Sequence, residues 1–357
     1  MIIDKRIDKL KEKLILLGLD SFLVMSPLNR RYLSGFTGTS GILLITLKQS
    51  FLFTDFRYIE QATSQALKYQ ILKHDFPFTK TLLEVLKRMP IETMGIESDF
   101  VTCKQFNELE EQLNSIKILP QEGIIEGLRL LKDEDEINCI KKAAQIADDA
   151  FDYILGVIKP GMKEIDVALK LEFFMRSQGA AAPSFETIVA SGSRSALPHG
   201  VASEKNIEKG DLVTMDFGCI YNGYCSDMTR TVVIGQPTPK QREVYQIVRD
   251  AQLKGLDAIR AGLGANEVDL KSRSYITSKG YGEYFGHGLG HGLGLNVHEN
   301  PSLSPRDNTE LLTNMVVTIE PGIYLPQWGG IRIEDLVVIN DTGCNNLTRA
   351  NKELIII

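Results

Sequence analysis

Three histidines lie close together in a part of the chain that is rich in glycine. They are His287, His291 and His298, within the segment 286–299. Glycine leaves the imidazole rings uncrowded and lets the backbone approach a ligand closely. This spacing therefore favours a common binding site over three histidines with unrelated roles. The segment is not the helical HExxH zinc motif, because no second histidine follows the His-Glu pair at the required spacing.

Two aspartates are predicted to share one face of a β-hairpin. The pair Asn222-Gly223 favours a two-residue type I′ turn. Counted outward from that turn, Asp216 lies opposite Thr229, and Asp227 lies diagonal to Asp216 on the same face. Two solvated strand aspartates are the alternative, but the residues around them are apolar. Like charges this close repel each other unless a positive charge lies between them.

Two glutamates also interrupt apolar, strand-like stretches. Glu320 lies within 315–325, and Glu334 lies within 331–339. The connection at 326–330 would fold these strands back on each other and bring the two glutamates opposite. A carboxylate in such a stretch is unfavourable to bury without a partner.

Arginine and metal ions are the two candidate partners for these acids. Arg332 or Arg230 would neutralise one glutamate, but arginine pairing for four acids in four strands is strained. Four carboxylates and one imidazole would balance two divalent cations. The oxygens favour Mn or Mg, and the imidazole favours Mn, Co, Zn or Fe. Two such cations can polarise a carbonyl and activate water, which is hydrolytic chemistry.

The elements that position these residues lie in the second of two expected domains, 124–357. A helix begins there after Asp133, with Glu136 three residues later as a capping box. Further helices are expected at 165–178, 239–261 and 267–279, with strands between them. The first domain, 1–123, alternates strands with helices. We expect its strands at 21–25, 42–47, 51–54, 94–97 and 116–119, and its helices at 58–67, 80–89 and 103–113.

Composition narrows the class of protein. The chain has 357 residues and a formal net charge of -6, which argues against a nucleic-acid-binding protein. Its apolar runs are too short to span a membrane, and its first residues do not form a signal peptide. The five cysteines are odd in number and include no CxxC pair. We expect reduced thiols and a cytoplasmic protein.

The sequence also resembles a known family over nearly its whole length: the prolidase and aminopeptidase P family of pita-bread metallopeptidases. The resemblance rests on segments in both predicted domains, namely 31–36, 53–58, 191–200, 216–218, 226–230, 286–299, 319–322 and 332–335. It implies an α+β fold. The pita-bread catalytic domain would be 124–357, and a smaller N-terminal α/β domain of creatinase type would be 1–123.

The resemblance implies roles for individual residues. It implies two divalent metal ions, with manganese first and cobalt or zinc as alternatives. The implied metal ligands are Asp216, Asp227, His291, Glu320 and Glu334, with Asp227 and Glu334 as the bridging groups. The implied substrate-binding residues are His199, His287, His298 and Arg332. Among these, His199 would stabilise the oxyanion, His298 would assist catalysis, and Glu320 would carry a proton to the leaving nitrogen.

The implied reaction is hydrolysis of the bond before proline by a metal-bridging hydroxide. Short peptides with proline at the second position would be the substrates, and dipeptides are favoured over the longer peptides that aminopeptidase P accepts. Methionine aminopeptidases generally lack such a front domain, and creatinase lacks the full ligand set. A metal-free binding module of the same fold is the alternative from a different class. The resemblance also implies a homodimer.

Overall fold

The computed structural model describes residues 2–357 and divides into two compact units. The first unit ends at Arg129, and the second comprises Leu130–Ile357. This division lies six residues beyond residue 123, where the pattern change had suggested a boundary. Helix α6 (Ile124–Arg129) belongs to the first unit, because Ile125 is buried and Arg129 Nη1 donates to Asn29 Oδ1 at 2.8 Å.

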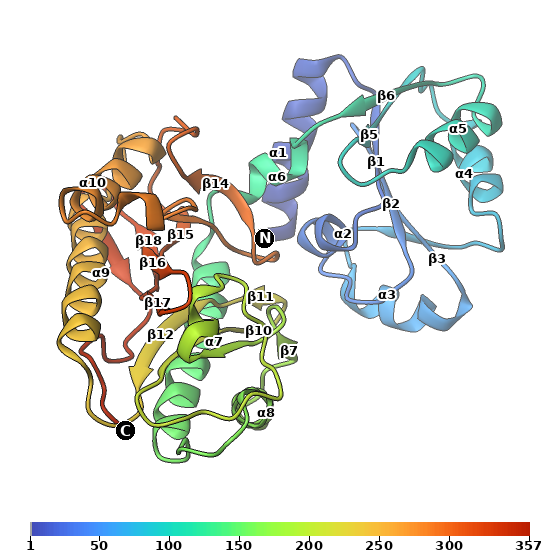
Figure 1. The fold of residues 1–357 in the computed structure, drawn as a ribbon. Coiled ribbons are helices and arrows are strands. Elements are labelled where there is room, and N and C mark those ends of the chain that lie inside the picture. The colour runs from blue at the N-terminus through green and yellow to red at the C-terminus, as the bar shows by residue number, and fades with distance from the viewer. Residues whose placement is uncertain (1) are drawn as a thin grey trace. The chain divides into compact units, whose positions relative to one another are not determined.

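The first unit is built on a six-stranded sheet with the order β4-β3-β2-β1-β5-β6 (Figure 1). The β1–β2 and β2–β3 pairs are antiparallel, and the other three are parallel. The strands are β1 (Ser21–Val24), β2 (Ile42–Thr46), β3 (Ser50–Thr54), β4 (Gln70–Lys73), β5 (Thr93–Glu97) and β6 (Lys117–Gln121). The helices besides α6 are α1 (Ile2–Leu17), α2 (Pro27–Ser34), α3 (Ile59–Gln65), α4 (Thr79–Leu86) and α5 (Cys103–Gln112), with a 3-10 turn at Phe56–Tyr58.

Strand β4 and helix α2 are among the elements of this unit that were not expected from the sequence. Strand β4 has only four residues, and the polar Gln70 and Lys73 at its ends hide its apolar centre. Helix α2 has eight residues and buries polar side chains, including Asn29 and Arg30. Neither segment shows the apolar periodicity on which a prediction from sequence depends.

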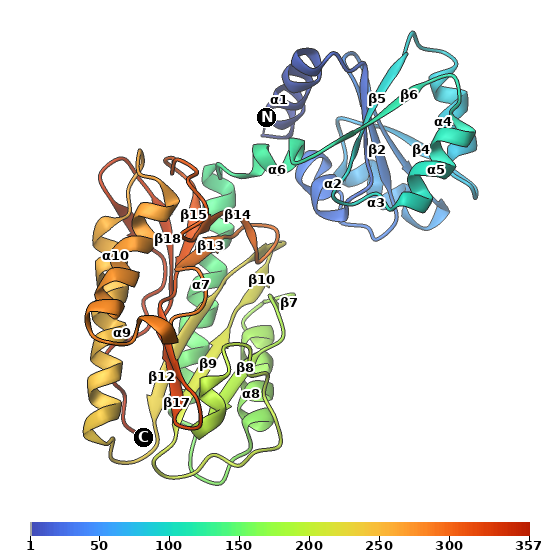
Figure 2. The same ribbon diagram turned by 45° about the horizontal axis from the view of Figure 1, so that its top comes forward.

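The second unit places strands between two pairs of helices, as both views show (Figures 1 and 2). One pair is α7 (Glu134–Leu155) and α8 (Glu164–Ser177), and the other is α9 (Pro239–Ala258) and α10 (Ala265–Ser278). The first strands are β7 (Ala182–Pro183), β8 (Ile188–Ser191), β9 (Leu212–Phe217), β10 (Cys219–Tyr221), β11 (Tyr224–Cys225) and β12 (Met228–Val233). The later strands are β13 (Gly290–Gly292), β14 (Glu299–Leu303), β15 (Val316–Ile319), β16 (Gly322–Leu325), β17 (Gly329–Arg332), β18 (Asp335–Ile339) and β19 (Cys344–Asn346). Short 3-10 turns lie at Gly192–Ala196 and Gly282–Tyr284.

The helix starts follow the local sequence. Asp133 caps α7, and Thr238 caps α9; both helices have the complete capping box, with Glu136 and Gln241 as the third-position partners. The cap predicted at Asp133 is confirmed.

The predicted hairpin register is also confirmed. Asn222 and Gly223 have φ values of 47° and 85°, the positive values that a type I′ turn requires. Asp216 pairs with Thr229 between β9 and β12. The expected continuous hairpin is nevertheless broken at Gly218, where a Cβ atom would lie 1.8 Å from the Ser226 carbonyl oxygen.

The two glutamate strands are broken in a similar way. Strand β15 pairs with β18, ending with Ile319 opposite Asp335. Strand β16 pairs with β17, beginning with Gly322 opposite Arg332. Glu320 and Glu334 therefore lie opposite each other in the gap between two ladders of the same register, as predicted, although the strands are not continuous.

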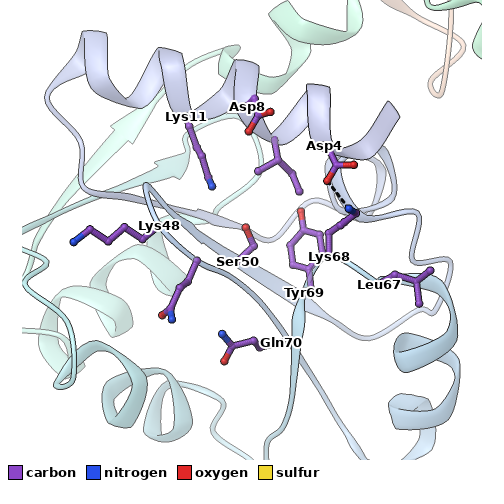
Figure 3. A pocket seen from close by; sticks show the side chains of 11 residues that line it. Asp4, Asp8, Lys11, Lys48, Ser50, Leu67, Lys68, Tyr69 and Gln70 are labelled. Atoms are coloured by element: carbon purple, nitrogen blue, oxygen red, sulfur yellow. Dashed lines mark ion pairs between the residues drawn. The ribbon is translucent and has the colours of Figure 1, made fainter. Parts of the chain in front are cut away.

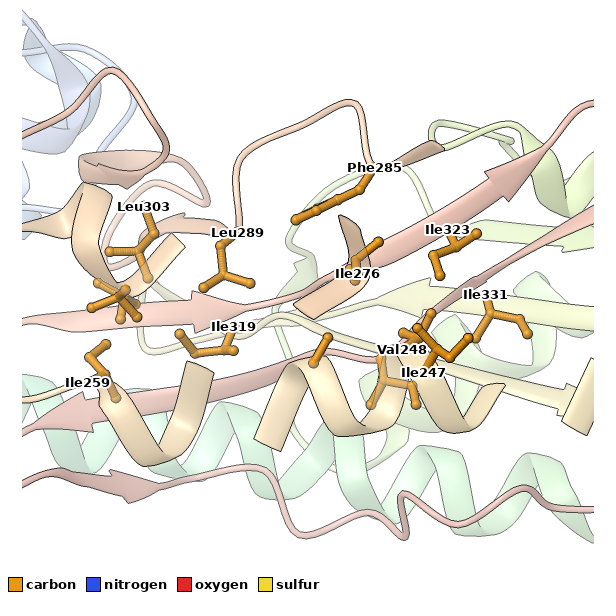
Figure 4. Packing of buried hydrophobic residues seen from close by; sticks show 14 of the residues in the cluster. Ile247, Val248, Ile259, Ile276, Phe285, Leu289, Leu303, Ile319, Ile323 and Ile331 are labelled. Atoms are coloured by element: carbon orange, nitrogen blue, oxygen red, sulfur yellow. The ribbon is translucent and has the colours of Figure 1, made fainter. Parts of the chain in front are cut away.

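A large apolar core holds this region in place (Figure 4). Ile247 and Val248 of α9 pack in the same buried cluster as Ile319, Ile323 and Ile331. All five are nearly inaccessible to solvent. The backbone on either side of Glu320 is thereby fixed by packing. Within residues 2–357, no helix has both the length and the apolar character needed to cross a membrane.

Candidate active site

The structure gathers the predicted site residues around one cavity of the second unit. Its volume is about 430 Å³. All nine predicted residues line it, namely Asp216, Asp227, His291, Glu320, Glu334, His199, His287, His298 and Arg332. They come from β9, β12, β13, β15 and β17 or from the connections beside these strands. Segments more than a hundred residues apart in the chain thus meet at one place.

Three of these residues form a compact set of metal-ligand atoms. One ligand atom each from Asp227, His291 and Glu334 lies within 4.8 Å of the others. Among the described residues, this is the only group of three histidine, cysteine or acidic side chains that meets this criterion. Glu320 is close by, with Oε1 at 3.3 Å from His291 Nε2.

Several carboxylate oxygens of the cluster are buried without a hydrogen-bond partner. They are Asp216 Oδ1, Asp227 Oδ1 and Glu334 Oε1. Buried polar atoms are nearly always satisfied, so three such oxygens in one cluster require an explanation. Oxygens that bind cations would have this arrangement, and the residues present therefore fit a divalent metal site.

The acids also disfavour each other's charged forms. Burial raises the pKa of Asp227 well above its usual range, and the charges of Glu334 and Asp216 raise it further. Burial and the charge of Glu320 have the same effect on the pKa of Glu334. Burial raises the pKa of Glu320 to about 7. Divalent cations would reverse these shifts, because an adjacent positive charge stabilises a carboxylate.

His291 presents a free nitrogen to the same cluster. Its Nδ1 lies 3.0 Å from the Gly292 carbonyl oxygen and donates to it. Burial lowers the pKa of His291, so the ring is neutral and Nε2 carries a lone pair. That lone pair faces Asp227 Oδ2 at 3.6 Å and Glu320 Oε1 at 3.3 Å. Three acceptors facing one another are stable only around a proton or a cation.

Arginine pairing, the alternative considered for the acids, holds for one member of the cluster. Arg332 Nη2 lies 2.6 Å from Asp216 Oδ2. The same guanidinium donates from Nε to Thr229 Oγ1 at 3.0 Å and from Nη1 to Tyr324 Oη at 2.7 Å. Arg230 instead pairs with Asp335 at 2.7 Å. Arginine therefore leaves Asp227 and Glu334 without a compensating ion pair.

The other three histidines form part of the cavity wall. His287 donates from Nδ1 to the Gly288 carbonyl oxygen, and Nε2 accepts from Tyr324 Oη at 2.9 Å. Both of its ring nitrogens are thus engaged by the protein. His199 and His298 are exposed on the cavity side. The centroids of the His298 and His291 rings are 4.4 Å apart. These two are accessible to a substrate.

Close packing explains the glycines between the histidines. A Cβ atom on Gly290 would lie 2.0 Å from the Thr318 carbonyl oxygen, and one on Gly292 would lie 2.2 Å from that of Asn300. Strand β13 thus approaches its neighbours closely enough to carry His291 into the cluster.

A pocket of the first unit has a different character (Figure 3). It has a volume of about 470 Å³ and is lined by residues of α1, including Lys11, and by the segments 48–50 and 67–70, which include Lys48 and Lys68. Lys68 pairs with Asp4 at 2.9 Å. No histidine or cysteine is among the residues that line it. It therefore lacks the mixed ligand set found in the second unit.

Comparison with family models identifies both units. Residues 138–341 match the metallopeptidase family M24, and residues 6–131 match the creatinase/prolidase N-terminal domain. The chain belongs to metallopeptidase family M24. The expected combination of a creatinase-type front domain with a pita-bread metallopeptidase domain is confirmed.

Relatives within family M24 match nearly the full chain. An Xaa-Pro dipeptidase from Pyrococcus furiosus is 41% identical over 352 residues, covering 98% of this chain and 99% of the relative. The structure of an Xaa-Pro dipeptidase from Bacillus anthracis is 48% identical, with a TM-score of 0.97, covering 99% of this chain and all of that one. An X-Pro aminopeptidase structure from Thermotoga maritima is 39% identical, with a TM-score of 0.92, covering 98% and 99%.

Two polar residues of this M24 site were not identified from the sequence. Thr229 Oγ1 donates to Glu334 Oε2 at 2.7 Å, and Thr318 Oγ1 donates to Glu320 Oε1 at 3.1 Å. The predicted hairpin placed Thr229 opposite Asp216, so a signal for Thr229 was present. Thr318 looks like an ordinary strand residue in sequence. In the structure its hydroxyl also accepts a hydrogen bond from His291 N, so that it links His291 to Glu320.

Proposed function

We propose that this M24 metallopeptidase is an Xaa-Pro dipeptidase, which hydrolyses the bond before proline in dipeptides. The observation that carries the proposal is the cluster of buried, partnerless carboxylate oxygens beside a neutral histidine. Full-length relatives with the same printed activity support the choice of substrate. The cavity next to the cluster has both an apolar wall, with Ile188 and Val201, and accessible imidazoles.

The proposed metal ligands are those expected from the sequence. Asp216, Asp227, His291, Glu320 and Glu334 would hold two divalent ions, with manganese as the proposed metal. When bound, such ions polarise the scissile carbonyl and lower the pKa of water. The oxygen-rich donor set with one imidazole suits manganese, while cobalt and zinc are the alternatives.

The chain's own residues would orient the substrate and move protons. His199 is exposed at the cavity and would donate a hydrogen bond to the carbonyl oxygen as negative charge develops on it. Glu320 would accept a proton from the attacking water and pass it to the imino nitrogen of the leaving proline. His298, whose ring packs against that of His291 at the cavity, would orient the dipeptide. Arg332 would hold Asp216 in position, and its charge would favour a substrate carboxylate nearby.

Aminopeptidase activity on longer peptides is the second candidate, and the X-Pro aminopeptidase relative supports it. Hydrolysis of Ala-Pro and Ala-Pro-Ala should be compared after metal removal and reconstitution with Mn, Co or Zn. We expect the manganese protein to cleave Ala-Pro efficiently and Ala-Pro-Ala poorly. Equal or faster cleavage of the tripeptide would establish the aminopeptidase alternative.

The metal-free binding module is tested by the same preparation. A protein that takes up no Mn, Co or Zn and cleaves neither peptide would contradict the enzyme proposal. We also propose a homodimer in the cytoplasm. The family resemblance supports the dimer, and five free cysteines agree with a reducing compartment. Light scattering and fractionation would check these two points.

A further inference from the structure

The back of the metal cluster is held by a buried ion pair that the reaction does not use. Arg230 is 1% exposed, and Asp335 is fully buried. Arg230 Nη2 donates to Asp335 Oδ1 at 2.7 Å. Neither residue lines the cavity. Their immediate neighbours in sequence, Thr229 and Glu334, meet on the cavity side, where Thr229 Oγ1 donates to Glu334 Oε2.

This arrangement follows from strand geometry. Successive side chains of an extended backbone point to opposite faces. The pair Thr229–Glu334 therefore lies on the side of the acidic cluster, where Glu334 lines the cavity, and the pair Arg230–Asp335 lies on the opposite side. The two pairs join the same two backbone segments from opposite sides.

Arg230 also binds the backbone of Glu334, the proposed metal ligand, directly. Its Nη1 donates to the Thr229 carbonyl oxygen at 2.9 Å and, by a shorter contact, to that of Glu334. Glu334 N in turn donates to the Thr229 carbonyl oxygen at 3.1 Å. One guanidinium thus fixes the position from which the Glu334 side chain extends.

Hydrogen bonds link the Arg230–Asp335 ion pair to the C-terminal segment of the chain. Asp335 Oδ2 accepts from Lys352 Nζ at 2.6 Å, from Asn346 Nδ2 at 2.7 Å and from Gln252 Nε2 at 2.9 Å. Arg230 Nη2 also donates to the Ala350 carbonyl oxygen at 2.8 Å. The surroundings of Asp335 therefore differ from those of Glu334, whose Oε1 has no partner.

We propose that Arg230, together with Asp335 and the C-terminal segment through Lys352, is a positioning device for the Glu334 carboxylate. Its role is to hold the ligand at the spacing that two divalent ions require. This inference rests on the proposed dinuclear site. Residues that orient metal ligands typically change metal affinity by about 10- to 100-fold when they are replaced.

The test measures Mn²⁺ binding to the full-length, metal-stripped protein by titration calorimetry and by electron paramagnetic resonance. We expect Arg230→Lys and Asp335→Asn to weaken the weaker-bound Mn²⁺ by about 10- to 100-fold. Lys352→Met, which removes only one donor to Asp335, should give a smaller loss in the same direction. The resonance signature of a coupled manganese pair should weaken in the same order.

Arg249→Met is the matched control. Arg249 forms an ion pair with Glu353 in the same C-terminal segment but has no bond to Glu334 or Asp335. It should leave Mn²⁺ binding unchanged. If Lys352→Met or any other folded member of the series binds both ions as the wild type does, with only a lower melting temperature, the inference is overturned. A wild-type protein that binds no Mn²⁺ would instead refute the proposed function.

Discussion

Glu97 in the first unit and the acids around Asp227 in the second are all largely buried, yet their surroundings differ. Glu97 accepts hydrogen bonds on both oxygens, from Met25 N at 2.6 Å, Ser26 N at 2.8 Å and Asn29 Nδ2 at 2.7 Å. Asp227 and Glu334 each keep one buried oxygen with no partner. Burial raises the pKa of each of these three acids.

The difference separates two uses of a buried carboxylate. An acid that stabilises a loop is surrounded by donors, which repay part of its desolvation. An acid that binds a cation keeps oxygens free for it. Without the metal, the repulsion between the neighbouring acids destabilises the fold. Neutralising an acid should therefore have opposite effects on stability in the two units, which Glu320→Gln and Glu97→Gln test directly.

The largest effect is expected from Asp227→Asn. It removes a charge and a ligand from the centre of the cluster, so peptide hydrolysis should fall by about 1000-fold, which corresponds to about 4 kcal/mol of transition-state stabilisation. Steady-state assays with Ala-Pro and a manganese titration would measure it. Near-normal hydrolysis at saturating metal would contradict the assigned role of Asp227.

The second variant, Glu320→Gln, tests the repulsion in the metal-free protein. The pKa of Glu320 is raised from 4.5 to about 7 in the fold, so folding favours its protonated form. Below pH 4.5 the group is protonated in both states, and the variant should match the wild type. As the pH rises to 7, the wild type should lose up to about 3 kcal/mol relative to the variant.

Denaturant unfolding of both proteins between pH 4.5 and 8 would measure this difference. Comparing them as a pair removes the contribution of the histidines, whose lowered pKa values act in the opposite direction. Added Mn²⁺ should restore the advantage of the wild type. A variant that is less stable than the metal-free wild type at pH 7 would contradict the comparison.

Glu97→Gln should have the opposite sign and a smaller size. The amide would place an NH₂ group against one of the three donors, leaving a buried donor unsatisfied and destabilising the first unit by about 2 kcal/mol. Urea unfolding would measure the loss, and unchanged Mn²⁺ affinity is the internal control. Stabilisation by this change would remove the contrast between the two units.

The smallest effect is expected at the hairpin turn, where a substitution changes the backbone geometry but no charge. Asn222 has φ of 47°, so Asn222→Ala should destabilise the second unit by about 1 kcal/mol through backbone strain. Asn222→Gly is the control and should lose less. Thermal unfolding would rank the two. Loss of metal binding in the alanine variant would mean that the register of Asp216 and Asp227 depends on this turn.

Local rules predicted much of the candidate site. Hairpin counting placed Asp216 opposite Thr229, and the cost of burying acids in apolar strands selected Glu320 and Glu334. The family resemblance supplied the choice of His291 among the three histidines. These signals depend on turn chemistry and on residue type, which are legible in the sequence itself.

Other features depend on contacts between distant segments. The donors to Asp335 come from Gln252, Asn346 and Lys352, on three separate elements. Short elements such as β4 are also invisible to periodicity, because four residues do not show a repeat.

The shared register of the ladders on either side of Glu320 and Glu334 restricts where the chain can change length. Strands β16 and β17 are joined by a short surface turn that includes Gln327 and Trp328. Inserting one residue there would shift one strand against the other and exchange its inward and outward side chains, so that Ile333 would take the place of Glu334. Deleting one residue would shift the strand the other way and put Asp335 there. This turn should therefore tolerate substitution but not a single-residue indel.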